Sequence, residues 1–215
     1  LALRRGAYYS RNSLITGAQA RITASVKTLL PVRNKSLSEL NALVIKKPRS
    51  VLRDMAVEIH KSTAKQVVVT ASRTKLTGND VARALASYMQ SDTVKVAVVD
   101  FSSRAKKLGI DLERLSVGSF VVAESAGHIS ILRPDGDLAA MELLSQRSFW
   151  KNIQSLNSTF DLVLLCADNS DAISLLSALE GQKIFHITIA KTKKTKSATL
   201  IHMRSLLPIQ GLLYD

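Results

Sequence analysis

The chain of 215 residues contains few of several residue types, and each shortage excludes a class of protein. Its one cysteine, Cys166, excludes a disulfide framework and fits a reducing compartment. Four prolines and nine glycines, beside an apolar fraction of 46%, are typical of a folded domain with a sizeable core. No apolar run reaches the ~18 residues that indicate a membrane-spanning helix, and the first residues show no signal peptide.

Acidic residues are also scarce, because 30 Lys and Arg stand against 17 Asp and Glu and give a net charge of +13. Residues 1–53 hold eleven basic residues and one acidic residue, Glu39, while residues 183–204 hold no acidic residue. A basic arm predicts contact with an anionic surface, either lipid headgroups or nucleic acid. Aromatic residues make up only 5%, so we place an anionic membrane surface above nucleic acid as the partner.

Apolar runs alternate with helical patterns along most of the chain. Several runs are continuously apolar, which predicts strands buried on both faces of a parallel sheet. We expect an α/β fold with a doubly wound, mostly parallel sheet and helices on both faces, at residues 46–215, after a basic juxtamembrane-type arm at residues 1–45. The predicted strands are 67–72, 94–100, 119–123, 128–133, 160–167, 183–190 and 210–214, and the predicted helices are 50–61, 79–90, 138–156, 170–179 and 195–207.

The stretch 67–82 has the frame of a phosphate-binding loop, with an apolar strand, a polar loop and a helix. A working loop has the pattern G-x-x-x-x-G-K-[ST], whose lysine reaches the phosphates and whose hydroxyl holds magnesium. Here the lysine and hydroxyl are absent, and a carboxylate stands where a phosphate would lie, so we expect no Mg-ATP cofactor. The loop part of this pocket comprises Ser72, Arg73, Lys75, Thr77, Gly78, Asn79 and Asp80.

Two basic side chains of this loop, Arg73 and Lys75, can still bind an anion, although solvated loop charges are the simpler interpretation. The four histidines are scattered without the spacing of metal ligands, so we expect no metal site.

Six short blocks stand in order along the chain: Pro48-Arg49-Ser50, Thr70-Ala71-Ser72-Arg73, Val98-Val99-Asp100, Glu142-Leu143-Leu144-Ser145, Phe160-Asp161-Leu162-Val163 and Gly211-Leu212-Leu213. Their order and spacing over residues 13–215 resemble the cytoplasmic domain of bacterial tyrosine kinases joined to polysaccharide co-polymerases, which are relatives of the ParA/MinD ATPases. The resemblance implies self-association, a place on the cytoplasmic side of the bacterial inner membrane, and polysaccharide polymerase or export machinery as partners. The basic start makes a membrane span before Leu1 a further expectation.

The chain departs from this family's pattern where the chemistry resides. The resemblance places the family's loop lysine and its two hydroxyls on Gly78, Asn79 and Asp80. The second strand motif keeps Asp100 but has Ser102 in place of its second aspartate.

The third strand motif and the first helix depart in the same way. Cys166 replaces the aspartate that orients magnesium, and Asp168, two residues on, is either a turn residue or a substitute carboxylate. The family's Glu-x-x-Arg-x-x-Arg motif, on a helix that builds a ring of subunits, falls on Asp54, Val57 and His60.

These losses favour a catalytically degenerate domain without catalytic residues, which serves as a scaffold or regulatory oligomerisation module, because phosphoryl transfer depends on positioned charges. One alternative is an active but atypical tyrosine kinase or ATPase that uses Lys75 and Asp168. Another is a ParA/MinD-like domain that binds nucleic acid through its basic arm.

Overall fold

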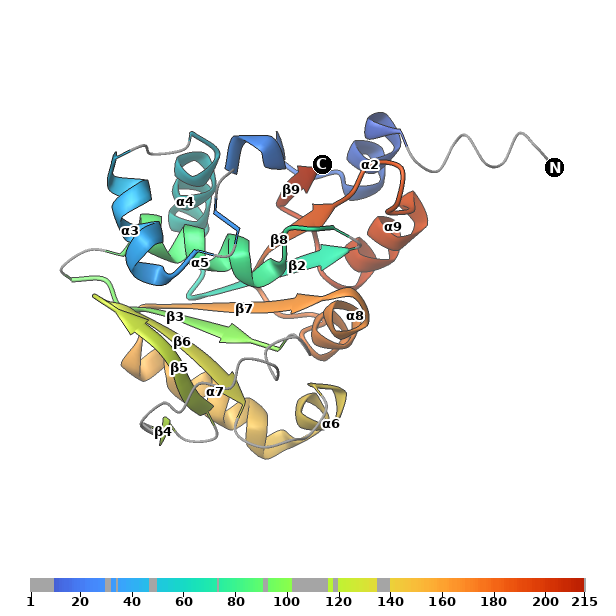
Figure 1. Ribbon diagram of the computed structural model, residues 1–215. Coiled ribbons are helices and arrows are strands. Elements are labelled where there is room, and N and C mark those ends of the chain that lie inside the picture. The colour runs from blue at the N-terminus through green and yellow to red at the C-terminus, as the bar shows by residue number, and fades with distance from the viewer. Residues whose placement is uncertain are drawn as a thin grey trace.

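The computed structural model describes residues 10–29, 32–33, 35–46, 50–72, 74–90, 93–101, 116–117, 120–134 and 140–214. Within these ranges one sheet has nine strands in the order β1-β9-β8-β2-β7-β3-β6-β5-β4. Helices cover both of its faces (Figure 1). The α/β class and the mostly parallel sheet are therefore confirmed.

All seven predicted strands form, and two short ones extend the sheet. The central strands pair in parallel, while β5 is antiparallel to both β4 and β6, and β1 joins β9 in parallel at the opposite edge. The strands are β1 (Ile22–Ser25), β2 (Gln66–Ser72), β3 (Val96–Asp100), β4 (Ser116–Val117), β5 (Phe120–Ala126), β6 (Ile129–Pro134), β7 (Leu162–Asp168), β8 (Phe185–Ala190) and β9 (Gly211–Tyr214).

The helices follow the predicted pattern with one correction. The single helix expected over 138–156 is two helices, because side chains bind backbone carbonyls that a continuous helix would use. The Trp150 indole N–H donates to the Leu144 carbonyl at 2.7 Å, and the Ser145 hydroxyl donates to the Glu142 carbonyl at 2.7 Å. The helices are α2 (Arg11–Ala18), the 3₁₀ helix η1 (Val26–Leu29), α3 (Leu37–Lys46), α4 (Ser50–Ser62), α5 (Gly78–Met89), α6 (Ala140–Leu144), α7 (Arg147–Thr159), α8 (Asn169–Ala178) and α9 (Ser197–Leu206).

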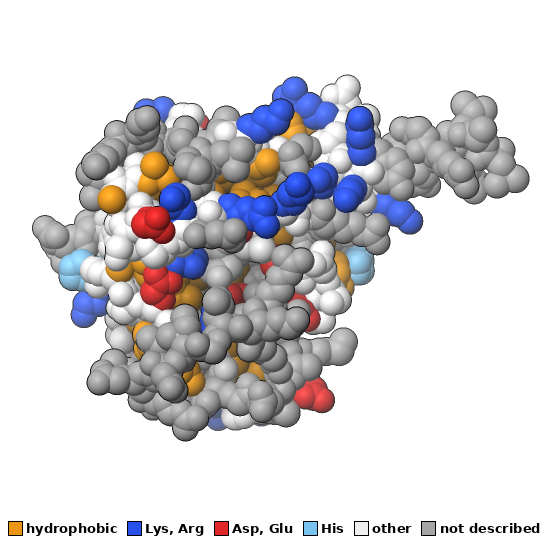
Figure 2. Space-filling view, viewed as in Figure 1, with side chains coloured by type: hydrophobic (Ala, Val, Ile, Leu, Met, Phe, Trp, Pro, Cys, Tyr) orange, Lys and Arg blue, Asp and Glu red, His pale blue; other side chains and the backbone are white. Residues whose placement is uncertain are grey.

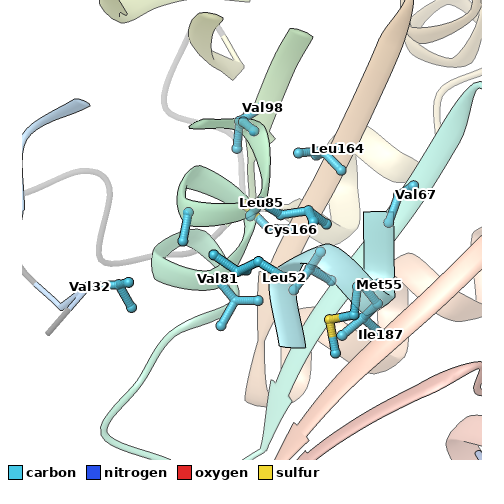
Figure 3. Packing of buried hydrophobic residues seen from close by; sticks show 14 of the residues in the cluster. Val32, Leu52, Met55, Val67, Val81, Leu85, Val98, Leu164, Cys166 and Ile187 are labelled. Carbon is cyan, nitrogen blue, oxygen red and sulfur yellow. The ribbon is translucent and has the colours of Figure 1, made fainter. Parts of the chain in front are cut away.

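The core has two layers because successive strand residues point to opposite faces of the sheet. Val67 and Val69 of β2 pack with α3, α4 and α5, and Figure 3 shows Leu52, Met55 and Leu85 of this layer around the strands. Val68 faces the other layer, which α2 and α6–α9 complete. The central strands are thus buried on both faces, which holds their carboxyl ends in fixed positions along one side of the sheet, where the strands end.

Residues 10–45, the described part of the expected arm, contribute to the same sheet and core. Strand β1 pairs with β9 (Ile22 opposite Gly211), and α2 packs on α9. Helix α3 packs on α5, and its Leu37 N–H donates to the Glu124 carboxylate at 2.7 Å. That carboxylate also pairs with Arg83 of α5 at 2.5 Å. The domain boundary at residue 45 stays a prediction, and residues 1–9 and 47–49 lie outside the described residues.

Candidate functional site

The candidate site lies where β2 ends at Ser72 and α5 begins at Gly78. Thr77 caps the helix, because its hydroxyl oxygen accepts the Asp80 N–H at 3.0 Å. The Asp80 carboxylate in turn accepts the Thr77 N–H at 3.0 Å and the Thr77 hydroxyl at 2.9 Å. This reciprocal capping box gives Asp80 a local structural role at a position where the resemblance expects a hydroxyl.

Gly78, at the position of the loop lysine, is closely surrounded. Its N–H donates to the Asp168 carboxylate at 2.8 Å, and a Cβ at this residue would lie 2.7 Å from the Val69 carbonyl oxygen. Asp168 stands at the end of β7, opposite Ala71 of the neighbouring strand β2. N–H groups at a helix start attract anions, and here a carboxylate of the protein itself occupies one of them.

The next residue, Asn79, closes the adjacent position. Its side-chain amide donates to the Asp100 carboxylate at 2.9 Å, and Asp100 is buried at the end of β3. Asn79 thus binds the aspartate that the resemblance places on the metal side of the motif. Both positions where the resemblance expects phosphate and metal chemistry are joined to aspartates at the carboxyl ends of β3 and β7.

Cys166 lies beneath these groups and is fully buried on β7. Its thiol donates to the Val99 carbonyl (3.4 Å) and lies 3.9 Å from an Asp100 carboxylate oxygen. Burial raises the pKa of the Cys166 thiol well above its usual value, and the nearby Asp100 and Asp168 carboxylates raise it further. A neutral, enclosed thiol does not act as a nucleophile at ordinary pH.

Solved structures share this fold over most of the chain. The chimerical protein CapA2B2 matches with a TM-score of 0.61 and 15% identity, over 95% of this chain and 98% of that chain. The BceF tyrosine kinase domain matches with a TM-score of 0.59 and 11% identity, over 97% and 98%. The VpsO kinase domain matches with a TM-score of 0.53 and 13% identity, over 82% and 93%.

The chain has the fold of a bacterial tyrosine kinase domain. At these identities the likeness establishes the fold. No family model matches the sequence, and no curated protein matches it.

Within the kinase fold, the predicted pocket residues separate into two groups. Gly78, Asn79 and Asp80 meet Asp100, Cys166 and Asp168 at the ends of β3 and β7. Ser72 and Lys75 do not join them. Sequence reasoning missed Thr195, which is buried and donates from its hydroxyl to the Ser72 carbonyl at 2.9 Å. Arg73 and Ser102 lie outside the described residues.

The expected oligomerisation residues lie together on α4 of the kinase fold. Asp54, Val57 and His60 recur every three residues and are all exposed, which places them on one side of the helix. Val57 keeps 46% of its surface exposed, although it is a large apolar side chain. Asp54 contacts Arg53 at 3.6 Å, and both side chains are solvated.

Two features are absent from the described part of the chain. No group of three or more His, Cys, Asp or Glu side chains there is arranged to hold a metal ion. No helix there has the length and apolar character to cross a bilayer.

Proposed function

We propose that this chain is a catalytically degenerate, kinase-like domain of an exopolysaccharide biosynthesis or export protein. It acts as a scaffold or regulatory oligomerisation module on the cytoplasmic face of a bacterial inner membrane, next to the polymerase or export machinery. The supporting observation is that Asp168 and Asn79 join the loop to the sheet edge where a kinase would hold phosphate and magnesium.

The energetics favour this proposal over an active enzyme. Removing one well-placed charge-stabilising donor costs about 10²–10³ in rate in a comparable enzyme. Here glycine occupies the lysine position, and the Asp168 carboxylate is fixed at the N–H group that a phosphate would use. Two like charges ~4 Å apart repel by roughly 1 kcal/mol in water and about 4 kcal/mol near a protein surface, so this carboxylate opposes a phosphate.

Mg-ATP at millimolar concentration is expected to leave the melting temperature of the protein unchanged. A ligand at about 100 times its Kd stabilises the native state by about 2.7 kcal/mol. In a domain of this size that stabilisation equals roughly 5–10 °C. Thermal denaturation with and without Mg-ATP therefore tests the proposal, and a rise of several degrees caused by nucleotide bound at Gly78, Asn79 and Asp80 would overturn it. Incubation with radiolabelled ATP is the companion assay, in which hydrolysis or autophosphorylation would support the atypical enzyme instead.

Self-association is expected to depend on the exposed side of α4. Val57→Glu places a charge where a partner subunit would bury an apolar side chain, and it should weaken self-association at least about tenfold. Sedimentation velocity over a concentration series measures the change. Ile201→Glu is the matched control, because Ile201 on α9 is exposed to a similar degree, 48% against 46% for Val57. Equal effects of the two variants, or a wild-type protein that stays monomeric, would contradict the oligomerisation role.

A further inference from the structure

A separate pocket opens beside the same loop, on the side of β8. It has a volume of about 290 Å³, and its described lining residues are Val26, Lys27, Arg33, Thr74, Lys75, Leu76 and Lys191. Strand β2 lies between β8 and β7 in the sheet. The aspartates that bind Gly78 and Asn79 extend from β7 and β3. Lys191 follows β8, on the other side of β2.

Buried contacts build this pocket from three separate segments. The Lys191 N–H donates to the Thr195 hydroxyl at 2.9 Å, and that hydroxyl donates to the Ser72 carbonyl at 2.9 Å, so the turn after β8 is tied to the end of β2. The Thr74 hydroxyl donates to the Leu76 carbonyl within the loop. Val26 and Leu76 are 7% and 5% exposed, and they anchor the η1 segment and the loop in the core. The η1 segment, the loop and the turn after β8 are therefore held in place by buried groups around this pocket.

The described lining of the pocket carries charge of one sign. Of the seven described residues that line it, four are basic and none is acidic. Within the described part of the chain, none of Lys27, Arg33 and Lys75 forms an ion pair. In Figure 2, Lys and Arg side chains gather in a band across the upper part of the molecule, and most of the visible acidic side chains lie below it. Because like charges held around one cavity repel, a bound anion would relieve this repulsion.

We infer that this outer cationic pocket binds a small, multiply charged phosphate of the pyrophosphate class, without a metal ion. Its volume lies at the lower limit of small-molecule sites, which suits a compact group. A guanidinium binds phosphate oxygens with paired N–H groups, and lysines supply compact charges around it. Lysine and arginine side chains would neutralise the phosphate charge that magnesium neutralises in a nucleotide pocket. The inference goes beyond the proposed function, since the site lies outside the loop positions closed by Asp168 and Asn79.

Isothermal titration with inorganic pyrophosphate and with ADP, in EDTA and at about 50 mM ionic strength, tests the inference. Binding of pyrophosphate is expected, with affinity that falls several-fold at about 200 mM. Equal binding of ADP identifies a phosphate ester as the ligand source, and weaker binding of ADP identifies the free anion. The double variant Arg33→Gln with Lys75→Gln should weaken binding at least about tenfold.

The control is Lys151→Gln, which removes an exposed charge from α7 and should leave binding unchanged. Arg33 and Lys75 are also exposed, so the double variant keeps its core, and its melting temperature is compared with that of the wild type first. No binding in EDTA, or equal loss in the double variant and the control, overturns the inference. Binding of anionic lipid vesicles without binding of pyrophosphate also overturns it.

The test separates this inference from the proposed function. If Mg-ATP stabilises the double variant as much as the wild type, nucleotide binds on the inner side of the loop. That result contradicts the proposed function and leaves the outer pocket unaffected. A failure of pyrophosphate to bind in EDTA contradicts only the outer pocket.

Discussion

Replacement of Gly78 by alanine is expected to lower the free energy of unfolding by about 1–3 kcal/mol. A Cβ at Gly78 would lie 2.7 Å from the Val69 carbonyl oxygen and 3.3 Å from that of Ala167. Both oxygens belong to central strands of the sheet, so neither can move without strain in β2 or β7. Alanine is otherwise the better helix former, so the expected sign is the reverse of the usual one. Urea denaturation of both proteins measures the difference.

Gly17→Ala is the matched control for this substitution. Gly17 also lies in a helix, but a Cβ there would meet the Ser197 carbonyl oxygen at 3.1 Å, a contact that a small shift of α9 against α2 can relieve. Its cost should therefore be clearly smaller. A Gly78→Ala protein as stable as the wild type would show that the loop backbone can move away, and the steric argument would then be wrong.

The variant Gly78→Lys tests both stability and Mg-ATP binding. The lysine begins with the same Cβ, so it incurs the same clash with Val69. A Cβ at this residue would lie 3.3 Å from an Asp168 carboxylate oxygen, so we expect the lysine to pair with that carboxylate rather than with a phosphate. Restoring the family's lysine alone is thus expected to destabilise the protein without creating Mg-ATP binding. Under the proposed function, loss of nucleotide chemistry at this position would involve the packing around the ends of β2 and β7 as well as one side chain.

The central fold could be predicted from the sequence because its signals are local. Continuous apolar runs such as Val67–Val69 and Leu162–Leu165 indicate doubly buried strands wherever they occur. Strand β1, Ile22–Ser25, has no such run, because an edge strand is only partly buried; its pattern is intermediate and exposed. Its place depends on pairing with β9 at the other end of the chain. The sequence therefore predicts a separate arm and gives no signal for the pairing of β1 with β9.

For the candidate site too, the sequence predicts features that depend on local spacing and does not predict contacts between distant residues. The resemblance predicts that Gly78, Asn79 and Cys166 are substituted positions, because a motif comparison needs only spacing. It cannot show that Gly78 bonds to Asp168, since that hydrogen bond joins residues 90 apart. The sequence predicts a turn residue or a substitute carboxylate at Asp168, and in the structure the Asp168 carboxylate accepts the Gly78 N–H. The outer pocket was missed for the same reason, because Lys27, Lys75 and Lys191 meet only in the folded chain.

A buried histidine makes the stability of this domain sensitive to acid. His186 of β8 is fully enclosed, and its Nδ1 lies 3.2 Å from the Leu207 carbonyl oxygen. A carbonyl only accepts, so Nδ1 carries the hydrogen, and Nε2 lies 2.9 Å from the Thr70 hydroxyl oxygen. Burial lowers the pKa of His186 to about 4, although the hydrogen bond to Leu207 opposes the shift. The imidazole is therefore neutral in the native state at pH 7.

Lowering the pH from about 6.5 to about 4 is expected to remove about 3 kcal/mol of stability through His186 alone. Below pH 6.5 the unfolded chain binds a proton at this histidine and the native state does not, so unfolding is favoured progressively until the pH reaches the native pKa of about 4. Carboxylates also titrate in this range, so the measurement is a difference. Urea denaturation from pH 7.5 to 4.5 is compared between the wild type and His186→Gln.

The wild type should lose about 2–3 kcal/mol more than His186→Gln over that range, even though the variant starts from a lower stability. His202→Gln is the control, because His202 is an exposed histidine on α9 and its removal should leave the wild-type pH dependence unchanged. Parallel curves for the wild type and His186→Gln would mean that the native protein protonates His186 as readily as the unfolded chain. The Thr70–His186–Leu207 contacts would then have to open at mild acidity, which their complete burial between β2, β8 and α9 opposes.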